Sequence, residues 1–402
     1  MKNILVLTYW SFNDPLIQTY TLPYLKIILK ILPVRSKIYL LCLEQDQYKG
    51  DLDLTSRQIK ELRDIGIQVL QYKYFAFGLK ALMGWMPILV KLSILILTKP
   101  IHYIHSWCMP PGVFSSLLAV IWRKPLIIDS YEPHAESNIE NGEWKLNSKA
   151  YKILFAFEKW QTKVAHSIIA TTKGMKKYAK IKYGVTIDRF FVKPACVNVN
   201  QFDFSKLKNQ LLSEELGLTD KVTLLYAGKF GGIYFDKEVF DLIKVASEYY
   251  GQDNFRALIL SNISEENVKK YCEEAGLSRD IIVLRFISHN RIQDYMNLAD
   301  FAISPVKPIP TKRYCTPIKD GEYWAMGLPV IIPQNISDDS EIIEENEIGY
   351  VLKGMTIEEY LNAFKKMDNL LKDKDIKTKI RQIAFKYRDF KVAEDVYQAI
   401  YG

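Results

Sequence analysis

Lys319 and Glu322 have side chains and a spacing that could bind a phosphorylated ligand. Strand-like apolar runs flank their segment, 316–327, which predicts a helix that begins at the carboxyl edge of a parallel sheet. The first backbone amides of that helix would face a phosphate, and Lys319 would add a full positive charge. Glu322 follows on the same helical face, where its carboxylate suits the vicinal hydroxyls of a ribose. The alternative is a plain helix start, with Lys319 solvated and Glu322 capping the helix.

A glycine-containing loop after the predicted strand at 221–226 supplies a second basic residue, Lys229. The glycines of this loop are Gly228, Gly231 and Gly232. Glycine permits positive φ and a close approach of the backbone to a ligand, and Lys229 could reach a diphosphate. Glycine turns after strands are also common without any ligand, so the structural alternative stays open here.

His134 lies in a loop dense in titratable groups, after a predicted strand at 126–129. Its imidazole could hydrogen-bond a sugar or a reacting hydroxyl, and Glu132 and Glu136 are alternative polar contacts. A lone histidine is more often structural than catalytic, so both interpretations stay open. His105 follows another predicted strand and could line the same site, with a weaker case than His134.

The elements that must position these residues alternate along the whole chain, which is typical of parallel sheets covered by helices. In the first half, strands are predicted near 3–9, 37–43, 67–72, 101–106, 126–129 and 167–171. Helices are predicted between them, near 15–31, 55–64, 76–98, 112–122, 144–164 and 173–182. A second series has strands near 221–226, 255–261, 281–285, 300–304, 328–333 and 348–352. Its helices are predicted near 236–249, 264–275, 289–298, 319–326, 339–345 and 355–371. The fold class is therefore α/β, with two doubly wound parallel sheets.

The chain between 194 and 203 lacks helical periodicity and is predicted to link the two domains. We expect a first domain at 1–198 and a second at 199–385. The remaining 386–402 contain an amphipathic helix that must find an apolar surface and is expected to return to the first domain.

The composition restricts the function further. Of 402 residues, 49% are hydrophobic and 25% charged, which excludes a disordered or collagen-like chain. Five scattered cysteines, without a CxxC pair or nearby histidine pairs, predict neither a disulfide framework nor a structural metal. A formal charge of +8 suits nucleotides, lipid diphosphates or phospholipid head groups, and the absence of a dense basic stripe argues against nucleic acid. Because no signal-peptide pattern opens the sequence, we expect a cytoplasmic protein.

The most apolar segment, 81–98, raises the question of a membrane span. Lys91 near its middle argues against one, as does Pro87, which is expected to begin a new helix. Such a helix is either almost wholly buried or lies on a membrane surface, with Trp85, Lys80 and Lys91 at the interface. The sequence therefore leaves open a peripheral contact with an anionic membrane.

The segment TPIKDGEYWAMGLPV, residues 316–330, resembles the donor-binding signature of family-4 GT-B glycosyltransferases. That signature reads Ser/Thr-Pro-x-Lys-x-x-Glu-Tyr-x-Ala-x-Gly-x-Pro-Val, and every fixed position matches. The two α/β domains, the linker and the terminal helix also fit this family. The resemblance implies two Rossmann-like domains facing each other across a cleft, with a nucleoside diphosphate sugar bound by the second.

The resemblance also implies roles for individual residues. Lys319 would bind the donor diphosphate, and Glu322 would hold the ribose hydroxyls. Lys229 would join Lys319 on the diphosphate, so that two lysines stabilise the leaving group in place of a metal ion. His134 corresponds best to a histidine that points toward the donor sugar in this family.

The remaining donor contacts are expected at the helix start and in the loop after the strand at 281–285, which holds the nucleobase in relatives. These residues are Thr316, Pro317, Ile318, Phe286 and Ile287.

Two departures from the family pattern concern the sugars. Many members have a glutamate at the position of Tyr314, in the loop that contacts the transferred sugar. The loop after the first strand also lacks the glycines that relatives have there. We therefore expect acceptor binding to use Asn13 and Asp14 with nearby aromatic rings, and His105.

Taken together, the sequence predicts a glycosyltransferase that moves a sugar from a nucleoside diphosphate sugar to a hydroxyl of a glycan or lipid-linked acceptor. The resemblance implies retention at the anomeric carbon, and no metal or other cofactor is expected. Two alternatives use the same donor site: a nucleotide-sugar 2-epimerase and a non-catalytic GT-B-like binding protein.

Overall fold

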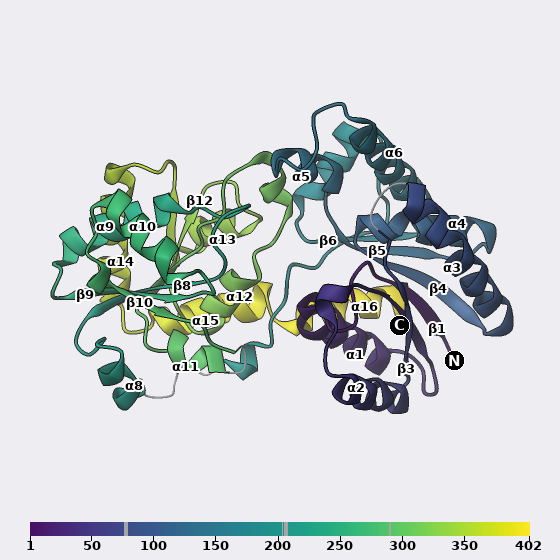
Figure 1. The fold of residues 1–402 in the computed structure, drawn as a ribbon, viewed down its shortest axis with the longest axis horizontal. Helices are drawn as coiled ribbons and strands as arrows, with labels where there is room; N and C mark the ends of the chain where they lie inside the picture. Colours follow the sequence, from purple (N-terminus) through teal and green to yellow (C-terminus); the bar gives the residue numbers. More distant parts are fainter. Residues whose placement is uncertain (76–78, 203, 205–207, 289–290) are drawn as a thin grey trace. The chain divides into compact units, whose positions relative to one another are not determined.

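Two units, each built on its own parallel sheet, make up the chain in a computed structural model that describes residues 1–75, 79–202, 204, 208–288 and 291–402 (Figure 1). Unit 1 comprises Met1–Lys193 and Lys391–Gly402, and unit 2 comprises Pro194–Phe390. The chain therefore leaves unit 1 once, forms the whole of unit 2, and returns to unit 1.

The sheet of unit 1 has seven parallel strands in the order β3-β2-β1-β4-β5-β6-β7. These strands are β1 (Asn3–Leu7), β2 (Ile38–Glu44), β3 (Ile67–Lys73), β4 (Ile101–Trp107), β5 (Leu126–Tyr131), β6 (Ser167–Ala170) and β7 (Phe190–Val192). The central strands are buried on both faces, which explains their continuous apolar runs.

Helices cover both faces of this sheet. They are α1 (Leu22–Ile31), α2 (Leu52–Ile65), α3 (Leu79–Thr98), α4 (Met109–Ile121), α5 (His134–Glu140), α6 (Lys149–Val164), α7 (Gly174–Tyr178) and α16 (Phe390–Tyr401). Short π-helical segments, Leu16–Thr21 and Ala179–Tyr183, precede α1 and follow α7. In Figure 1, α4 and α6 lie on one face, and α1, α2 and the returning α16 lie on the other.

Two helix predictions in unit 1 were wrong in detail. The helix expected over 144–164 begins only at Lys149, because Ser148 caps it by accepting a hydrogen bond from the Tyr151 amide. Pro87 does not begin a helix but lies inside α3, on an exposed part of its surface. Water can satisfy the backbone carbonyl that loses its partner there. The first three residues of the predicted helix 76–98 lie outside the described residues.

The sheet of unit 2 has six parallel strands in the order β10-β9-β8-β11-β12-β13. These strands are β8 (Val222–Ala227), β9 (Phe255–Leu260), β10 (Ile282–Arg285), β11 (Phe301–Ile303), β12 (Val330–Pro333) and β13 (Gly349–Leu352). The helices are α8 (Gln210–Glu215), α9 (Lys237–Tyr250), α10 (Glu265–Ala275), α11 (Ile292–Met296), α12 (Ile318–Ala325), α13 (Asp339–Asn346), α14 (Ile357–Leu371) and α15 (Ile376–Tyr387). Among the described strands and α-helices, four elements, α5, β7, α8 and α15, have no counterpart in the sequence prediction. For the helix predicted at 289–298, residues 289 and 290 lie outside the described residues.

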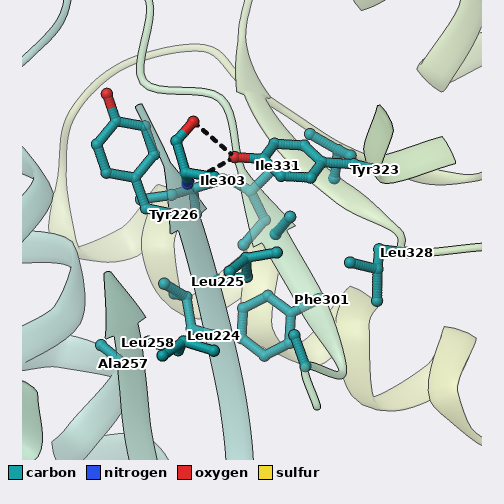
Figure 2. Packing of buried hydrophobic residues seen from close by; sticks show 14 of the residues in the cluster. Leu224, Leu225, Tyr226, Ala257, Leu258, Phe301, Ile303, Tyr323, Leu328 and Ile331 are labelled. Carbon is teal, nitrogen blue, oxygen red and sulfur yellow. Dashed lines mark hydrogen bonds between the residues drawn. The ribbon is translucent and has the colours of Figure 1, made fainter. Parts of the chain in front are cut away.

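The packing of the core of unit 2 determines where the loops of its candidate site lie. Leu224, Leu225 and Phe301 come from β8 and β11, which pair in parallel, and they pack at the centre of the sheet (Figure 2). The loops after these two strands therefore leave the same edge. Tyr323 of α12 lies above that edge, with its phenol oxygen directed at the end of β8 (Figure 2).

The apolar helix α3 does not qualify as a membrane span. Among the described residues, no helix is both long enough and apolar enough to cross a bilayer.

Candidate active site

The start of α12 presents backbone amides without a competing cap. The helix follows β11 and a short 3₁₀-helix, Pro310–Tyr314, and begins at Ile318 directly after Pro317. Proline has no polar side chain, and no side chain caps the first turn. The positive end of the helix dipole is therefore available to an anion at the carboxyl edge of the sheet.

Lys319 and Glu322 form an ion pair on this first turn. Lys319 Nζ lies 2.6 Å from Glu322 Oε2, and the Glu322 side chain is only 2% exposed, against 29% for Lys319. The structure thus brings together the two residues that the sequence singled out. A pair of this kind can be divided between a phosphate, which takes the ammonium group, and hydroxyls, which donate to the carboxylate.

The glycine loop after β8 is bound to the loop that leads to α12. The Phe235 amide donates to the Pro305 carbonyl at 2.8 Å, and the Lys307 amide donates to the Ile233 carbonyl at 2.9 Å. Lys307 Nζ also reaches the Gly232 carbonyl at 3.1 Å. These bonds hold the two loops side by side along one edge of the sheet.

The backbone at two of the glycines explains the residue type. Gly231 has φ +81° and Gly232 has φ +62°, in the left-handed region that residues with a Cβ rarely adopt. The prediction that this loop exploits the freedom of glycine is therefore consistent with its geometry. Gly228 begins the same loop, directly after β8.

Two tyrosines brace this arrangement. The Tyr323 hydroxyl accepts a hydrogen bond from the Ala227 amide at 2.8 Å, which ties α12 to the end of β8. The Tyr226 hydroxyl donates to the carbonyl of Lys229 and so fixes the backbone of the loop. Lys229 itself has an exposed side chain and lines a cavity of about 270 Å³, together with Asn262 and Tyr271 among others.

The expected base-binding residues lie farther along the same edge, after β10. Phe286 is 78% exposed, whereas Ile287 is partly buried against the core of unit 2. Strands β9 and β8 separate β10 from β11, so these residues are not adjacent to the start of α12.

A buried charge cluster supports the other side of α12. Arg388 Nη1 donates to both carboxylate oxygens of Asp339, at 2.8 Å each. The other two guanidinium nitrogens donate to the carbonyls of Pro317 and Ala195. Burial and the nearby Asp339 carboxylate raise the pKa of Asp320 well above its usual range. Inside unit 2, the buried charge of Arg388 is thus paired with the carboxylate of Asp339.

Arg388 links three segments that are distant in sequence. It joins the end of α15 to the start of α12 through Pro317, and to the linker through Ala195. A methyl group at Gly321 would lie 3.1 Å from Arg388 Nε, so the absence of a side chain there permits the close contact. Arg388, Asp320 and Asp339 were not identified from the sequence, because only the fold brings them together.

In unit 1, His134 begins α5, immediately after β5. Its Nδ1 is hydrogen-bonded to the Glu132 carbonyl at 3.0 Å, and the ring is partly exposed. Glu158 of α6 stabilises the first turn of α5 by accepting a hydrogen bond from the Ala135 amide at 2.9 Å. Burial raises the pKa of Glu158 to about 8. His134 and the lysines of α12 and the glycine loop belong to different units.

His105 is fully buried and belongs to a network that anchors α16. Its Nδ1 is hydrogen-bonded to the Tyr401 hydroxyl at 2.6 Å, and its Nε2 lies 3.4 Å from Asp129 Oδ2. The Tyr397 hydroxyl donates to the same carboxylate at 2.7 Å, and Lys193 Nζ lies 3.2 Å from its other oxygen. The structure therefore gives His105 structural partners and no exposed surface for an acceptor.

This network also determines the charge of Asp129, its central residue. Burial alone would raise the pKa of Asp129, but Lys193 and the hydrogen bond from His105 outweigh it and hold the pKa at about 2. The ammonium group of Lys193 further lies 3.9 Å from the centre of the Tyr24 ring, in a cation–π contact. Asp129 is consequently a buried carboxylate that binds the terminal helix.

The two other expected acceptor residues also have structural partners. The side chains of Asn13 and Thr55 are hydrogen-bonded at 3.2 Å, and Asp14 Oδ1 accepts a bond from the Leu16 amide at 2.8 Å. Beside this loop, at the carboxyl ends of β2 and β3, lies a cavity of about 620 Å³ that the sequence did not reveal. Its lining consists of Glu44, Gln45, Asp46, Gln47, Gln71, Tyr72, Lys73 and Tyr74.

No metal-binding cluster is present in the part of the chain that the structure describes. There, no group of three or more histidine, cysteine, aspartate or glutamate side chains is arranged to hold a metal ion.

Comparison with solved structures shows that the fold extends over the whole chain. The Anabaena protein HepE, in complex with UDP, has a TM-score of 0.71 at 13% identity and covers 100% of this chain and 98% of its own. A glycosyltransferase from Rickettsia africae has a TM-score of 0.69 at 16% identity, covering 100% and 97%. WaaG, a glycosyltransferase of lipopolysaccharide biosynthesis, has a TM-score of 0.68 at 14% identity, covering 99% and 100%. No curated protein matches the sequence.

The two parallel sheets with helices on both faces, and these structural matches, define a GT-B fold. The predicted α/β architecture with two Rossmann-like domains is confirmed. Residues 208–387, which include α12 and the glycine loop, match the family model for glycosyl transferases group 1. The fold over the whole chain and the family match over residues 208–387 both support a glycosyltransferase, as the sequence predicted.

Proposed function

We propose that the protein transfers a sugar from a nucleoside diphosphate sugar to a hydroxyl of a glycan or a lipid-linked saccharide. The observation that carries this proposal is the first turn of α12, where Lys319 and Glu322 lie together at an uncapped helix start. The UDP bound to HepE supports the donor class and makes UDP the first nucleotide to test.

In the proposed donor complex, Lys319 and Lys229 bind the diphosphate. Glu322 exchanges its lysine partner for the ribose hydroxyls, and its burial strengthens these bonds because water does not screen them. As the bond between sugar and phosphate breaks, negative charge grows on the leaving diphosphate. The two ammonium groups and the α12 amides stabilise that charge, so we propose that the reaction needs no metal ion.

We propose that the reaction proceeds with retention. The acceptor hydroxyl attacks the anomeric carbon from the face that the diphosphate leaves, while the anomeric C–O bond to the phosphate breaks. The departing phosphate oxygen takes the proton of the hydroxyl, so no side-chain nucleophile is required. His134 is proposed to hydrogen-bond the sugar or the reacting hydroxyl, and Phe286 and Ile287 to flank the base.

The cavity at the ends of β2 and β3 is the proposed acceptor site. The rings of Tyr72 and Tyr74 offer apolar faces to a sugar, and Glu44 and Gln71 offer hydrogen-bonding groups. The Phe12 amide donates to Glu44 at 3.2 Å and so joins this wall to the loop of Asn13 and Asp14. The proposal includes a cytoplasmic location with peripheral contact to the inner face of the membrane, where a lipid-linked acceptor would be presented.

Calorimetric titration with UDP, GDP, ADP and TDP, each without metal, tests the donor site. We expect one of these nucleotides to bind and Glu322→Ala to weaken that binding by about 1.5–3 kcal/mol, because charge-assisted bonds to both ribose hydroxyls are lost. Lys319→Ala should also weaken it. Failure of all four nucleotides to bind would contradict the proposal.

Analysis of the products tests the reaction itself. Release of free nucleoside diphosphate together with a new glycoside supports transfer to an acceptor. An isomerised nucleotide sugar would instead identify a 2-epimerase, and nucleotide binding without turnover would identify a binding protein.

A further inference from the structure

An exposed apolar stripe runs the length of α3. Five side chains on this face, spaced at three or four residues, are each more than half exposed: Met83, Met86, Val90, Ile94 and Leu97. The opposite face is buried and consists of Trp85, Ile88, Leu92 and Ile96. Of the two alternatives for this helix, the one in which it is almost wholly buried is therefore wrong for one of its faces. Trp85 is also not at a surface, because it stacks on Phe114 with ring centres 3.8 Å apart.

The end of α4 extends the stripe. Trp122 Nε1 donates to Ser93 Oγ at 3.0 Å, which places the last turns of α3 and α4 side by side. Val120 and Ile121, at the end of α4, are 53% and 65% exposed. So many exposed apolar side chains on neighbouring helices are uncommon on a protein that meets only water.

The segment that carries this surface has charges of one sign. Between Asp64 and Asp129 the sequence contains no aspartate or glutamate and six basic residues: Lys73, Lys80, Lys91, Lys99, Arg123 and Lys124. Lys91, Lys99 and Arg123 have exposed side chains, the first within the helix and the other two just beyond the ends of α3 and α4. An apolar stripe flanked by unneutralised cations matches an anionic lipid surface, with acyl chains below and phosphates beside it.

We infer that the stripe of α3, together with the end of α4, binds an anionic bilayer surface. This inference names the surface that makes the proposed peripheral membrane contact. It rests on the proposed function, because the contact would bring unit 1 to a lipid-linked acceptor. The helix lies in the plane of the interface and inserts its apolar face among the head groups. Lys91, Lys99 and Arg123 then meet lipid phosphates.

Vesicle flotation of the full chain tests the inference, using phosphatidylcholine alone and phosphatidylcholine mixed with phosphatidylglycerol, without any nucleotide. We expect binding to the anionic vesicles that weakens as salt is raised, and little binding to the neutral ones. The double substitution Ile94→Gln with Leu97→Gln should lower the affinity at least about tenfold, since both side chains are exposed and leave the core intact. Lys99→Gln with Arg123→Gln should lower binding to the anionic vesicles and reduce its salt dependence.

Leu52→Gln with Leu54→Gln is the matched control, because these leucines of α2 are at least as exposed as Ile94 but lie outside the stripe. This control should float like the unmodified protein. Equal loss in the control, or no binding of the unmodified protein to anionic vesicles, would overturn the inference. So would a dimer in sedimentation equilibrium that the stripe variant loses while vesicles stay unbound, since the face would then belong to a second copy.

Nucleotide titration of the same proteins separates the two proposals. A protein that binds nucleotide but not vesicles overturns only the membrane inference. A protein that floats but binds no nucleotide overturns only the donor site. Because the nucleotide site lies in unit 2, urea denaturation and circular dichroism of the stripe variant must match those of the unmodified protein to show that unit 1 is folded.

Discussion

Lys319 and Glu322 satisfy each other's charge, at 2.6 Å, on the turn proposed to bind the donor. A nucleoside diphosphate must therefore separate the pair, and each residue gains a new partner of matching charge or polarity. Binding of the diphosphate by Lys319 and binding of the ribose by Glu322 can therefore be tested separately.

Glu322→Gln should weaken UDP binding by about tenfold to a hundredfold, because a neutral amide makes weaker hydrogen bonds to the ribose than a carboxylate does. The same substitution should leave the binding of inorganic pyrophosphate unchanged or tighter, since it releases Lys319. Calorimetry with both ligands measures the difference. Glu394→Gln is the control, because it removes an exposed ion pair with Lys391 that has the same i, i+3 spacing. It should change neither the UDP affinity nor the pyrophosphate affinity. Parallel losses for UDP and pyrophosphate in Glu322→Gln would refute the assigned roles.

Arg388→Met should lower the free energy of unfolding by about 3–5 kcal/mol, because the substitution leaves the carboxylate of Asp339 buried without a counterion. Urea denaturation provides the measurement. Arg313→Met is the control, since Arg313 pairs with Glu341 at 3.5 Å on an exposed surface and should change stability by less than about 1 kcal/mol. Equal effects from the two arginines would show that burial of the Arg388 pair is unimportant.

Glu158 should make stability depend on pH between about 4.5 and 8. Its pKa is raised by burial to about 8 in the folded protein, so the folded state binds a proton that the unfolded chain releases above its ordinary pKa. This contribution is complete below pH 4.5 and is lost as the pH rises through 8, with a slope of up to about 1.4 kcal/mol per pH unit. Asp129, with a pKa of about 2, titrates below this window.

Urea denaturation across pH 5–8 tests this dependence by comparing the unmodified protein with Glu158→Gln. The glutamine retains an acceptor for the Ala135 amide and can donate to the Tyr183 hydroxyl, but it does not titrate. The slope assigned to Glu158 should therefore be absent from the variant. An identical slope in both proteins would mean that Glu158 is ionised when folded.

Tyr397→Phe should lower the free energy of unfolding by about 1–3 kcal/mol, because the buried Asp129 carboxylate loses a hydrogen bond of 2.7 Å and gains nothing in return. Thermal or urea denaturation measures the change. Tyr387→Phe alters a less buried tyrosine of α15 and should have an effect within about 0.5 kcal/mol. A neutral Tyr397→Phe would show that the terminal helix is held by apolar packing alone.

The donor turn could be predicted from the sequence because its geometry is local. Lys319 and Glu322 lie within one helical turn, and their spacing alone sets them on the same face. The alternating pattern of apolar runs also predicts both sheets, since buried parallel strands need continuous apolar residues. Short or weakly patterned elements such as β7 gave no comparable signal.

The buried networks could not be predicted, because their members meet only in the folded chain. His105 was expected to follow a strand, as a ligand-binding residue would, but it lies inside β4, and its partner Tyr401 is 296 residues away. Likewise, the composition of α3 indicates an apolar helix, but it does not show that only one face of the helix packs against the rest of unit 1. Both outcomes depend on tertiary neighbours rather than on local pattern.

Because unit 2 lies between two parts of unit 1 in the sequence, the order of synthesis constrains folding. A ribosome completes all of unit 2 before it makes Tyr397 and Tyr401. Until then, Asp129 and His105 lack the hydroxyls that satisfy them, and the surface that α16 later covers stays open to water. Unit 2 can therefore reach its native state first, and a nascent chain stalled after it would expose an unfinished unit 1 to chaperones and proteases.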